Sequence, residues 1–186
     1  MKENNFKKDP KLLIDLAKNG DKEAFGVLYE MYFVPVFRYL FARLNSKTET
    51  EDLTQEVFLK VYQNINKVEI KDNSPLSYFF TVARNLLIDY WRKKKEVLIE
   101  KEIVLPNYKE SDLIEQIEKK EMGEIIKKLI RELTLDQQEV IILRFINEMS
   151  NKEIAKLLGK REDAVRQLQS RALKNLREKL KNLKIL

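Results

Sequence analysis

The stretch "SNKEIAKLLGKREDAVRQLQSRALKNLRE", residues 150–178, contains two amphipathic segments on either side of Gly159. The first segment, residues 151–158, places Ile154, Ala155 and Leu158 on one helical face. The chain must then turn sharply, and glycine takes a positive φ without a Cβ clash. The second segment, about 161–180, repeats apolar residues at helical spacing: Val165, Leu168, Ala172, Leu176 and Leu180. The pattern predicts a helix-turn-helix.

The outer face of the second helix carries polar side chains of the kinds that read base pairs. These are Glu162, Arg166, Gln167, Ser170, Arg171 and Lys174. In the major groove, arginine binds guanine and glutamine binds adenine, each through paired hydrogen bonds. Lys160, Arg161 and Lys174 are better placed to neutralise phosphates. The alternative is an ordinary helical hairpin whose basic face is solvated.

The charge distribution favours a polyanionic partner for this end of the chain. Residues 150–186 carry 11 basic and 4 acidic side chains, whereas residues 96–139 carry 7 basic and 12 acidic ones. A strongly basic segment that follows an acidic one is typical of nucleic-acid binding. Together with the helix-turn-helix pattern, this asymmetry predicts that the C-terminal part binds duplex DNA.

The first two helices of the N-terminal half are predicted over residues 9–20 and 21–45. In the first, the apolar residues at helical spacing are Leu12, Leu13 and Leu16. In the second, they are Phe25, Leu28, Tyr32, Val36, Tyr39 and Leu40. Pro35 lies inside the second segment, where it predicts a kink or a break, because proline removes a helical hydrogen bond.

Two further helices of this half begin with recognisable N-terminal signals. Thr48 and Glu51 have the spacing of a capping box. Ser74 followed by Pro75 predicts an N-cap and a first helical residue. The side chains expected to be buried in these helices are Leu53, Val57, Phe58, Val61, Ile65, Phe79, Phe80, Val82, Ala83, Leu86 and Tyr90.

The chain therefore divides into two helical domains. The first spans residues 1–95, an acidic linker spans 96–110, and the second domain spans 111–186. Thr134 with Gln137 and Ser150 with Glu153 each have capping-box spacing inside the second domain. The fold class predicted from these patterns is all-α.

Two exposed faces of the first domain suggest different partners. Asp52, Gln55, Glu56 and Leu59 share one face of a helix, opposite its apolar stripe. An acidic face with one protruding leucine suits a protein partner better than DNA. The last helix of this domain combines aromatic and basic side chains, which suit single-stranded nucleic acid. They are Tyr78, Arg84, Asn85, Trp91 and Arg92.

The composition makes catalysis the weakest interpretation. The chain has no Cys and no His, so disulfides, thiolate or imidazole metal sites and His-dependent triads are excluded. We expect no cofactor and no metal. The polar N-terminus has no secretory signal and no apolar run could span a membrane, so we expect no membrane insertion and a cytoplasmic location.

Three motifs in order make the chain resemble a bacterial RNA polymerase sigma factor of the extracytoplasmic-function (ECF) type. They are "EDLTQEVFLKVYQNI", "SPLSYFFTVARNLLIDYWRKKK" and "LTLDQQEVIILRFINEMSNKEIAKLLGKREDAVRQLQSRALKNLRE". The resemblance covers about residues 12–180. It implies a promoter-specificity subunit without catalysis of its own. Implied partners are core RNA polymerase, through its β′ clamp helices and β flap, promoter DNA and an anti-sigma protein.

The resemblance also implies roles for matching residues. Asp52, Gln55 and Glu56 would dock on the β′ clamp helices. Asn85 would help to recognise the melted −10 element, and the loop 64–75 would capture a flipped base. Side chains along the same DNA strand would be Tyr78, Arg84 and Arg92–Lys95. Those reading the −35 element would be Arg166, Gln167, Ser170 and Arg171.

The sequence departs from the family at the start of the recognition helix. Arg161 and Asp163 stand where many members have serine and glycine, so the usual N-cap is missing. Two other protein classes remain as alternatives. A free-standing helix-turn-helix regulator would bind duplex DNA only, and an interaction protein would occupy a helical partner without reading DNA.

Overall fold

The computed structural model describes residues 9–44, 46–68, 74–101, 117–183 and 185. Within these residues the chain is helical and contains no strand, which confirms the predicted all-α class. The first group of helices is α2 (Pro10–Lys18), α3 (Lys22–Phe41), α4 (Lys47–Gln63), the short η1 (Ile65–Lys67) and α5 (Pro75–Lys101). The second group is α6 (Ile117–Arg131), α7 (Leu135–Ile141), the π-helical turn η2 (Ile142–Ile146), α8 (Asn151–Leu158) and α9 (Glu162–Asn182).

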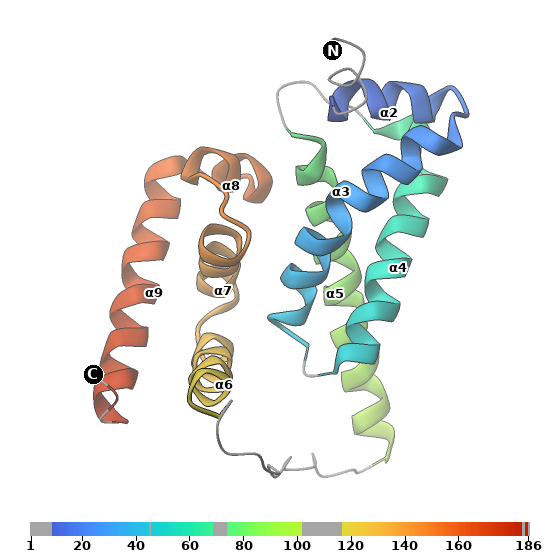
Figure 1. Ribbon diagram of the computed structural model, residues 1–186. Coiled ribbons are helices and arrows are strands. Elements are labelled where there is room, and N and C mark those ends of the chain that lie inside the picture. Colours follow the sequence, from blue (N-terminus) through green and yellow to red (C-terminus); the bar gives the residue numbers. More distant parts are fainter. Residues whose placement is uncertain (1–8, 45, 69–73, 102–116, 184, 186) are drawn as a thin grey trace.

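The two groups stand side by side (Figure 1). Helices α3, α4 and α5 pack together in the first group, with α2 across one end of α3. In the second group α9 lies on the outside, and α7 lies between α9 and the first group. The α9 surface therefore points away from α3 and α5.

The buried apolar side chains form one continuous cluster that includes residues of both groups. Tyr39, Phe79 and Phe80 are the largest fully buried side chains of the first group. In the second group, Ile142, Leu143 and Ile154 are fully buried. The two helical groups thus share a hydrophobic core in this conformation.

The predicted helices are present, but the buried stripe of α2, the start of α4 and the end of α5 differ from the prediction. In α2 the buried residues are Leu13, Ile14 and Ala17, while Leu16 is 39% exposed. The stripe was misplaced because the packing of α2 on α3 decides which of several adjacent apolar residues faces inward. A run of adjacent apolar residues in a short helix does not specify that rotation.

Helix α3 passes through Pro35 without a break. Its flanking residues Tyr32, Val36 and Tyr39 are buried, and each buried side chain of this size contributes about 1.5–3 kcal/mol. Their burial offsets the ~3 kcal/mol that an interior proline costs a helix. The proline is therefore tolerated inside α3.

Helix α4 starts two residues earlier than the predicted Thr48–Glu51 box, at Lys47 after the N-cap Ser46. The Ser46 hydroxyl accepts a hydrogen bond from the Glu49 backbone N–H at 3.2 Å. Helix α5 begins at Pro75 as predicted and runs to Lys101, so residues 96–101 of the predicted linker are helical.

Candidate nucleic-acid and protein interfaces

The turn between α8 and α9 has the geometry that the sequence predicts. Gly159 ends α8 with φ +61°, in the left-handed region, and the Lys160 N–H donates to the Ala155 carbonyl at 2.9 Å. Ser150 and Glu153 form the predicted capping box at the start of α8. The Ser150 hydrogen bonds lower the pKa of Glu153. These local contacts fix where α9 leaves the turn, and α9 then presents its outer face to solvent.

Helix α9 begins without a side-chain cap, as the sequence suggested. Arg161 occupies the N-cap position and makes no capping hydrogen bond. Its guanidinium instead pairs with the Asp163 carboxylate, which lowers the pKa of Asp163. Glu162 and Asp163 place negative charge at the positive end of the helix, which stabilises it.

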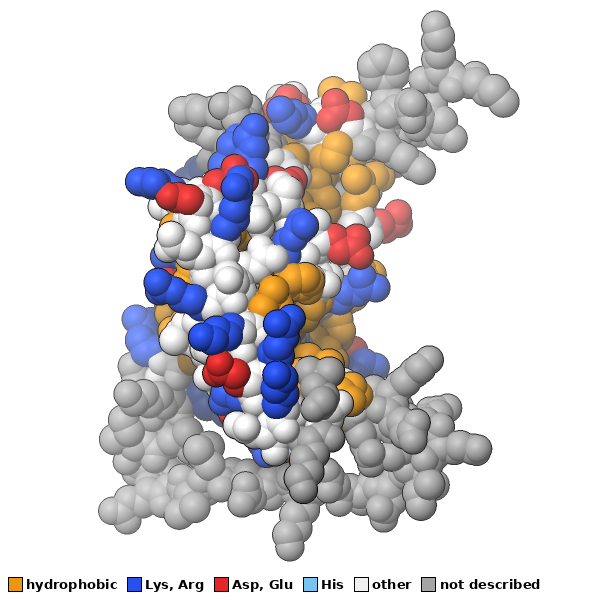
Figure 2. Space-filling view, turned by 90° about the vertical axis from the view of Figure 1, so that its left-hand side faces the viewer, with side chains coloured by type: hydrophobic (Ala, Val, Ile, Leu, Met, Phe, Trp, Pro, Cys, Tyr) orange, Lys and Arg blue, Asp and Glu red, His pale blue; other side chains and the backbone are white. Residues whose placement is uncertain are grey.

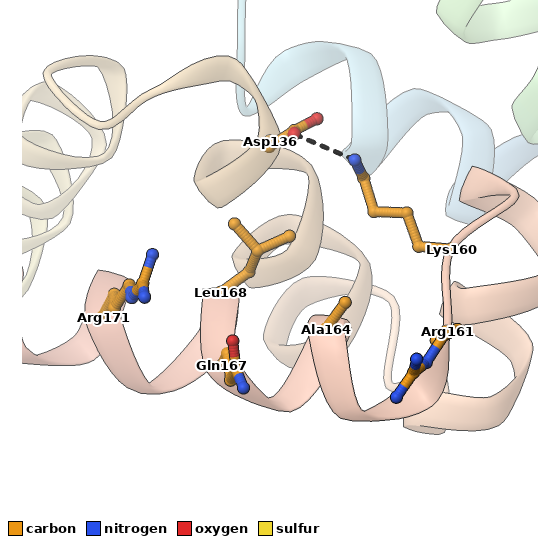
Figure 3. A pocket seen from close by; sticks show the side chains of 7 residues that line it. All are labelled: Asp136, Lys160, Arg161, Ala164, Gln167, Leu168 and Arg171. Carbon is orange, nitrogen blue, oxygen red and sulfur yellow. Dashed lines mark hydrogen bonds and ion pairs between the residues drawn. The ribbon is translucent and has the colours of Figure 1, made fainter.

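The predicted reading residues lie on one exposed face of α9. Arg166, Gln167, Ser170, Arg171 and Lys174 are all exposed. A shallow hollow of about 340 Å³ lies beside them at the N-terminal end of the helix. Its lining residues are Asp136, Lys160, Arg161, Ala164, Gln167, Leu168 and Arg171 (Figure 3). Facing this side of the molecule, Lys and Arg side chains clearly outnumber acidic ones (Figure 2).

The basic side chains of this face differ in how they are held. The Arg166 guanidinium pairs with the Glu162 carboxylate at 2.6 Å, and Lys160 Nζ reaches Asp136 at 3.0 Å. Lys174 approaches Glu178 at 4.0 Å. Arg171 forms no ion pair with any residue that the structure describes. Among the described residues, Gln167, Ser170 and Arg171 have no carboxylate partner, whereas Arg166 and Lys174 each have one.

On α4, the predicted docking residues Asp52, Gln55, Glu56 and Leu59 are all exposed. Leu59 is 55% exposed, which is high for a leucine. Next to it is an apolar hollow of about 460 Å³ between α3 and α4. The hollow is lined by Lys22, Phe25, Gly26, Tyr29, Gln55, Phe58, Leu59 and Tyr62.

The sequence-based reasoning missed the α3 side of this hollow. Phe25 and Tyr29 are four residues apart and so share a face of α3. Across the groove, the Phe25 ring meets that of Tyr62 edge-on at 4.8 Å, and the Tyr29 ring lies 4.6 Å from that of Phe58. Gly26 also lines the hollow, and a Cβ at this position would meet no atom within 4 Å. The aromatic spacing was a usable signal for a second exposed apolar face.

On α5, the predicted aromatic and basic residues differ in how far they are exposed to solvent. Asn85 and Arg92 are exposed, and Arg92 pairs with Asp89 at 3.1 Å. Tyr78 and Trp91 are partly buried against the core. Arg84 is also partly buried, and its Nε lies 3.6 Å from the Glu139 carboxylate of α7. Within loop 64–75, residues 69–73 lie outside the described residues.

No metal centre is visible in the part of the chain that the structure describes. No cluster of three or more acidic residues there has the arrangement that could hold an ion. Among the described helices, none combines the length and apolar character needed to cross a bilayer.

Two family models match the chain. Sigma-70 region 2 matches residues 28–97, and Sigma-70, region 4 matches residues 123–176. The ECF RNA polymerase sigma factor SigX of Bacillus subtilis is 31% identical over 88% of this chain and 87% of its own length. The ECF sigma factor BldN of Streptomyces coelicolor is also 31% identical, but the chain spans only 63% of its length.

Solved structures share the fold. The structure of CnrH in complex with the cytosolic domain of CnrY aligns with a TM-score of 0.73 and 21% identity, covering 94% of this chain and 99% of CnrH. The sigma factor RpoE of Bartonella quintana, solved with the anti-sigma factor NepR, aligns with a TM-score of 0.65 and 21% identity over 84% of this chain and 96% of RpoE. The two family models and the similarity to SigX establish that the chain belongs to the ECF group of RNA polymerase sigma factors, which direct promoter-specific initiation of transcription.

Proposed function

We propose that this chain binds core RNA polymerase through its first domain and guides it to promoters that it reads through both domains. The first domain would comprise residues 1–95 and the second residues 111–186, on either side of the acidic linker. The observation that carries the proposal is the separation of three chemically different surfaces, each on one helix. They are the acidic and apolar face of α4, the mixed face of α5 and the basic face of α9.

The α4 surface would dock on the β′ clamp helices of the polymerase. Asp52 and Glu56 offer carboxylates to basic side chains, and Leu59 with the neighbouring aromatic hollow offers an apolar contact. An apolar anchor beside charged groups is the composition that concentrates binding energy in protein interfaces. A DNA backbone would be repelled by the same carboxylates. A second polymerase contact, from the β flap to the second domain, follows from family membership.

The α5 surface would hold the melted −10 element. Asn85 and Arg92 are exposed and supply a base-edge partner and a phosphate partner. Tyr78 and Trp91 are only partly buried, and aromatic side chains at such positions suit stacking on an unpaired base. Arg84 would join this surface once its contact with α7 is released.

The α9 surface would read the −35 element as duplex. Gln167 and Arg171 are free of carboxylate partners, so they are the side chains we assign to base edges. Arg166 and Ser170 lie beside them on the same face. Lys160, Arg161 and Lys174 flank this group and would contact phosphates, which position the helix but carry no sequence information.

Three further properties follow from the proposal. The chain would carry no catalytic step, since phosphodiester synthesis belongs to the core enzyme. It would act in the cytoplasm, where the polymerase and the chromosome are. Because RpoE was solved with an anti-sigma factor, we propose a comparable protein inhibitor for this chain.

The test is run-off transcription with purified core RNA polymerase on a library of genomic fragments. We expect discrete new transcripts whose start sites share spaced −35 and −10 elements. The matched variant replaces Asp52 and Glu56 by lysine, which reverses the docking charge at exposed positions. It should fold normally and support no transcription. If the native protein yields no transcripts and binds only duplex DNA, the chain is an ordinary helix-turn-helix regulator.

A further inference from the structure

A buried acidic side chain of the second domain reaches into the first. Glu139 lies on α7, and its carboxylate oxygens each accept from the Tyr39 hydroxyl of α3 at 3.1 Å. The Arg43 guanidinium, at the end of α3, lies 3.0 Å from the same carboxylate. Arg84 of α5 is the third partner, at 3.6 Å. One carboxylate thus contacts two helices of the other domain.

The site on the first domain that binds this carboxylate includes buried side chains that also contact one another. The Arg43 side chain is 2% exposed and the Glu139 side chain 10% exposed. Arg43 also donates to the Tyr39 carbonyl at 2.9 Å and lies over the Tyr39 ring at 3.9 Å. Burial raises the pKa of Tyr39, so its hydroxyl stays protonated and remains a donor to Glu139.

Two more contacts join the domains on either side of Glu139. The Asn147 side-chain amide donates to the Pro35 carbonyl of α3 at 2.8 Å. On the other side, Lys127 of α6 places its ammonium group 4.4 Å from the centre of the Phe41 ring. The interface therefore runs along α3, with the Glu139 cluster between two weaker contacts.

The charges at this site make Glu139 the residue on which the contact between the two domains depends. Arg43 and Arg84 bring two positive charges to one site, and Glu139 supplies the negative charge between them. A buried charge that loses its partner is strongly destabilised. If substitution removed the charge of Glu139, the Arg43 guanidinium, whose side chain is 2% exposed, would lose this buried partner and could be hydrated only by moving into water, which favours separation of the domains. Arg84 depends less on Glu139, because its side chain is already 43% exposed.

The closed arrangement is incompatible with simultaneous reading of both promoter elements. The −35 and −10 elements lie about 25 base pairs apart, or ~85 Å at 3.4 Å per base pair. Helix α5, with 27 residues, is only about 40 Å long. The closed domains cannot cover such a distance while they pack side by side. In addition, Glu139 occupies Arg84, which the proposed −10 surface requires.

We propose that Glu139 is an intramolecular latch that holds the free protein closed and must leave the Tyr39–Arg43–Arg84 site before the −35 and −10 elements can be read together. The blocking of −10 recognition rests on the proposed function above, but the latch itself does not. The carboxylate occupies a cationic site on the first domain. Binding to core polymerase, which separates the domains along the promoter, would then release the latch.

The experiment measures energy transfer between dyes on the two domains. The chain contains no native cysteine, so Gln63→Cys on α4 and Asn175→Cys on α9, both exposed positions, accept the dyes selectively. We expect Glu139→Gln to lower the transfer efficiency of the free protein. Asn147→Ala should lower it as well, through an independent contact. Glu132→Gln is the matched control, because Glu132 pairs with Lys179 inside the second domain.

Adding purified core RNA polymerase tests the latch separately from the proposed sigma-factor function. A closed population of about 90% weakens apparent binding to any partner that requires the open form about tenfold. Glu139→Gln should therefore bind core polymerase up to about tenfold more tightly than the native chain. Unchanged transfer in both Glu139→Gln and Asn147→Ala, with native helical content, would overturn the latch. Lowered transfer without polymerase binding would support the latch and refute the proposed function.

Discussion

Leu59→Ala on α4 tests the proposed polymerase contact at its least polar point. Leu59 is 55% exposed in the free protein, so docking would remove about half of its surface from water. Complete burial of a leucine contributes about 1.5–3 kcal/mol, and half of that is about 0.75–1.5 kcal/mol. Losing this contribution predicts an affinity about three- to twelvefold weaker. The measurement is the dissociation constant for purified core RNA polymerase by biolayer interferometry.

Leu16→Ala is the matched control for this experiment. Leu16 has a comparable exposed fraction, 39%, but lies on α2 and does not line the apolar hollow. We expect native affinity for Leu16→Ala. Both variants should unfold within a few degrees of the native chain, because both residues already contact water. Equal affinity of Leu59→Ala and the native protein would show that the hollow and its leucine are not the docking surface.

Three other predictions concern α9, the turn before it and one surface ion pair. Arg171→Ala should weaken binding to the −35 duplex by about 1–3 kcal/mol and leave binding to a mixed-sequence duplex unchanged. Lys174→Gln should weaken binding to both duplexes equally. Fluorescence anisotropy measures the affinity in each case. Gly159→Ala should lower the free energy of unfolding in urea by about 1 kcal/mol; a Cβ there meets no atom within 4 Å, so the cost is the positive φ alone. The hydrogen bond from the Tyr90 hydroxyl, and after it the contact with Lys94, lowers the pKa of Glu49 from its ordinary value of 4.5. The charged Glu49 side chain therefore contributes stability above pH 4.5, and this contribution is lost as the pH falls through the lowered pKa. Glu49→Gln should therefore be less stable than the native chain at pH 7 and equally stable once the pH is below that pKa, by urea unfolding.

Local signals in the sequence predicted the starts of α7 and α8 and the turn before α9. The capping boxes at Thr134 and Ser150 are both present, and Gly159 has the left-handed conformation that the turn requires. Each signal depends on residues within four positions of one another. Hydrogen bonds at that range need no contact from another helix, so local spacing located these two caps, although the same spacing at Thr48 and Glu51 did not mark the start of α4.

Signals that depend on packing were less reliable. Ser46 and Thr48 are both able to cap α4, and the structure uses Ser46. The choice depends on where the preceding chain enters the core, which local sequence does not encode. The exposed faces of α4 and α9 were predicted correctly because a long amphipathic helix defines its own solvent side.

The contacts between the domains could not be predicted from sequence patterns. Glu139 is 100 residues from Tyr39, and Asn147 is 112 residues from Pro35. Nothing in the position of Glu139 along the sequence distinguishes it from an exposed acidic residue near the start of a helix. Its burial depends on a pocket whose members, Arg43 and Arg84, come from two other helices.

The two kinds of arginine pair suggest an order of events at a promoter. Arg166 and Glu162 form an exposed pair on one helix, and such pairs contribute about 0–1 kcal/mol, so a base or phosphate displaces the carboxylate easily. The pair between Arg43 and Glu139 is buried, and breaking such a pair without replacing the partner is far more costly. In the proposed mechanism, the α9 face would therefore be available to DNA in the free protein. The α5 face would become complete only when a larger binding energy, which we assign to core polymerase, separates the domains.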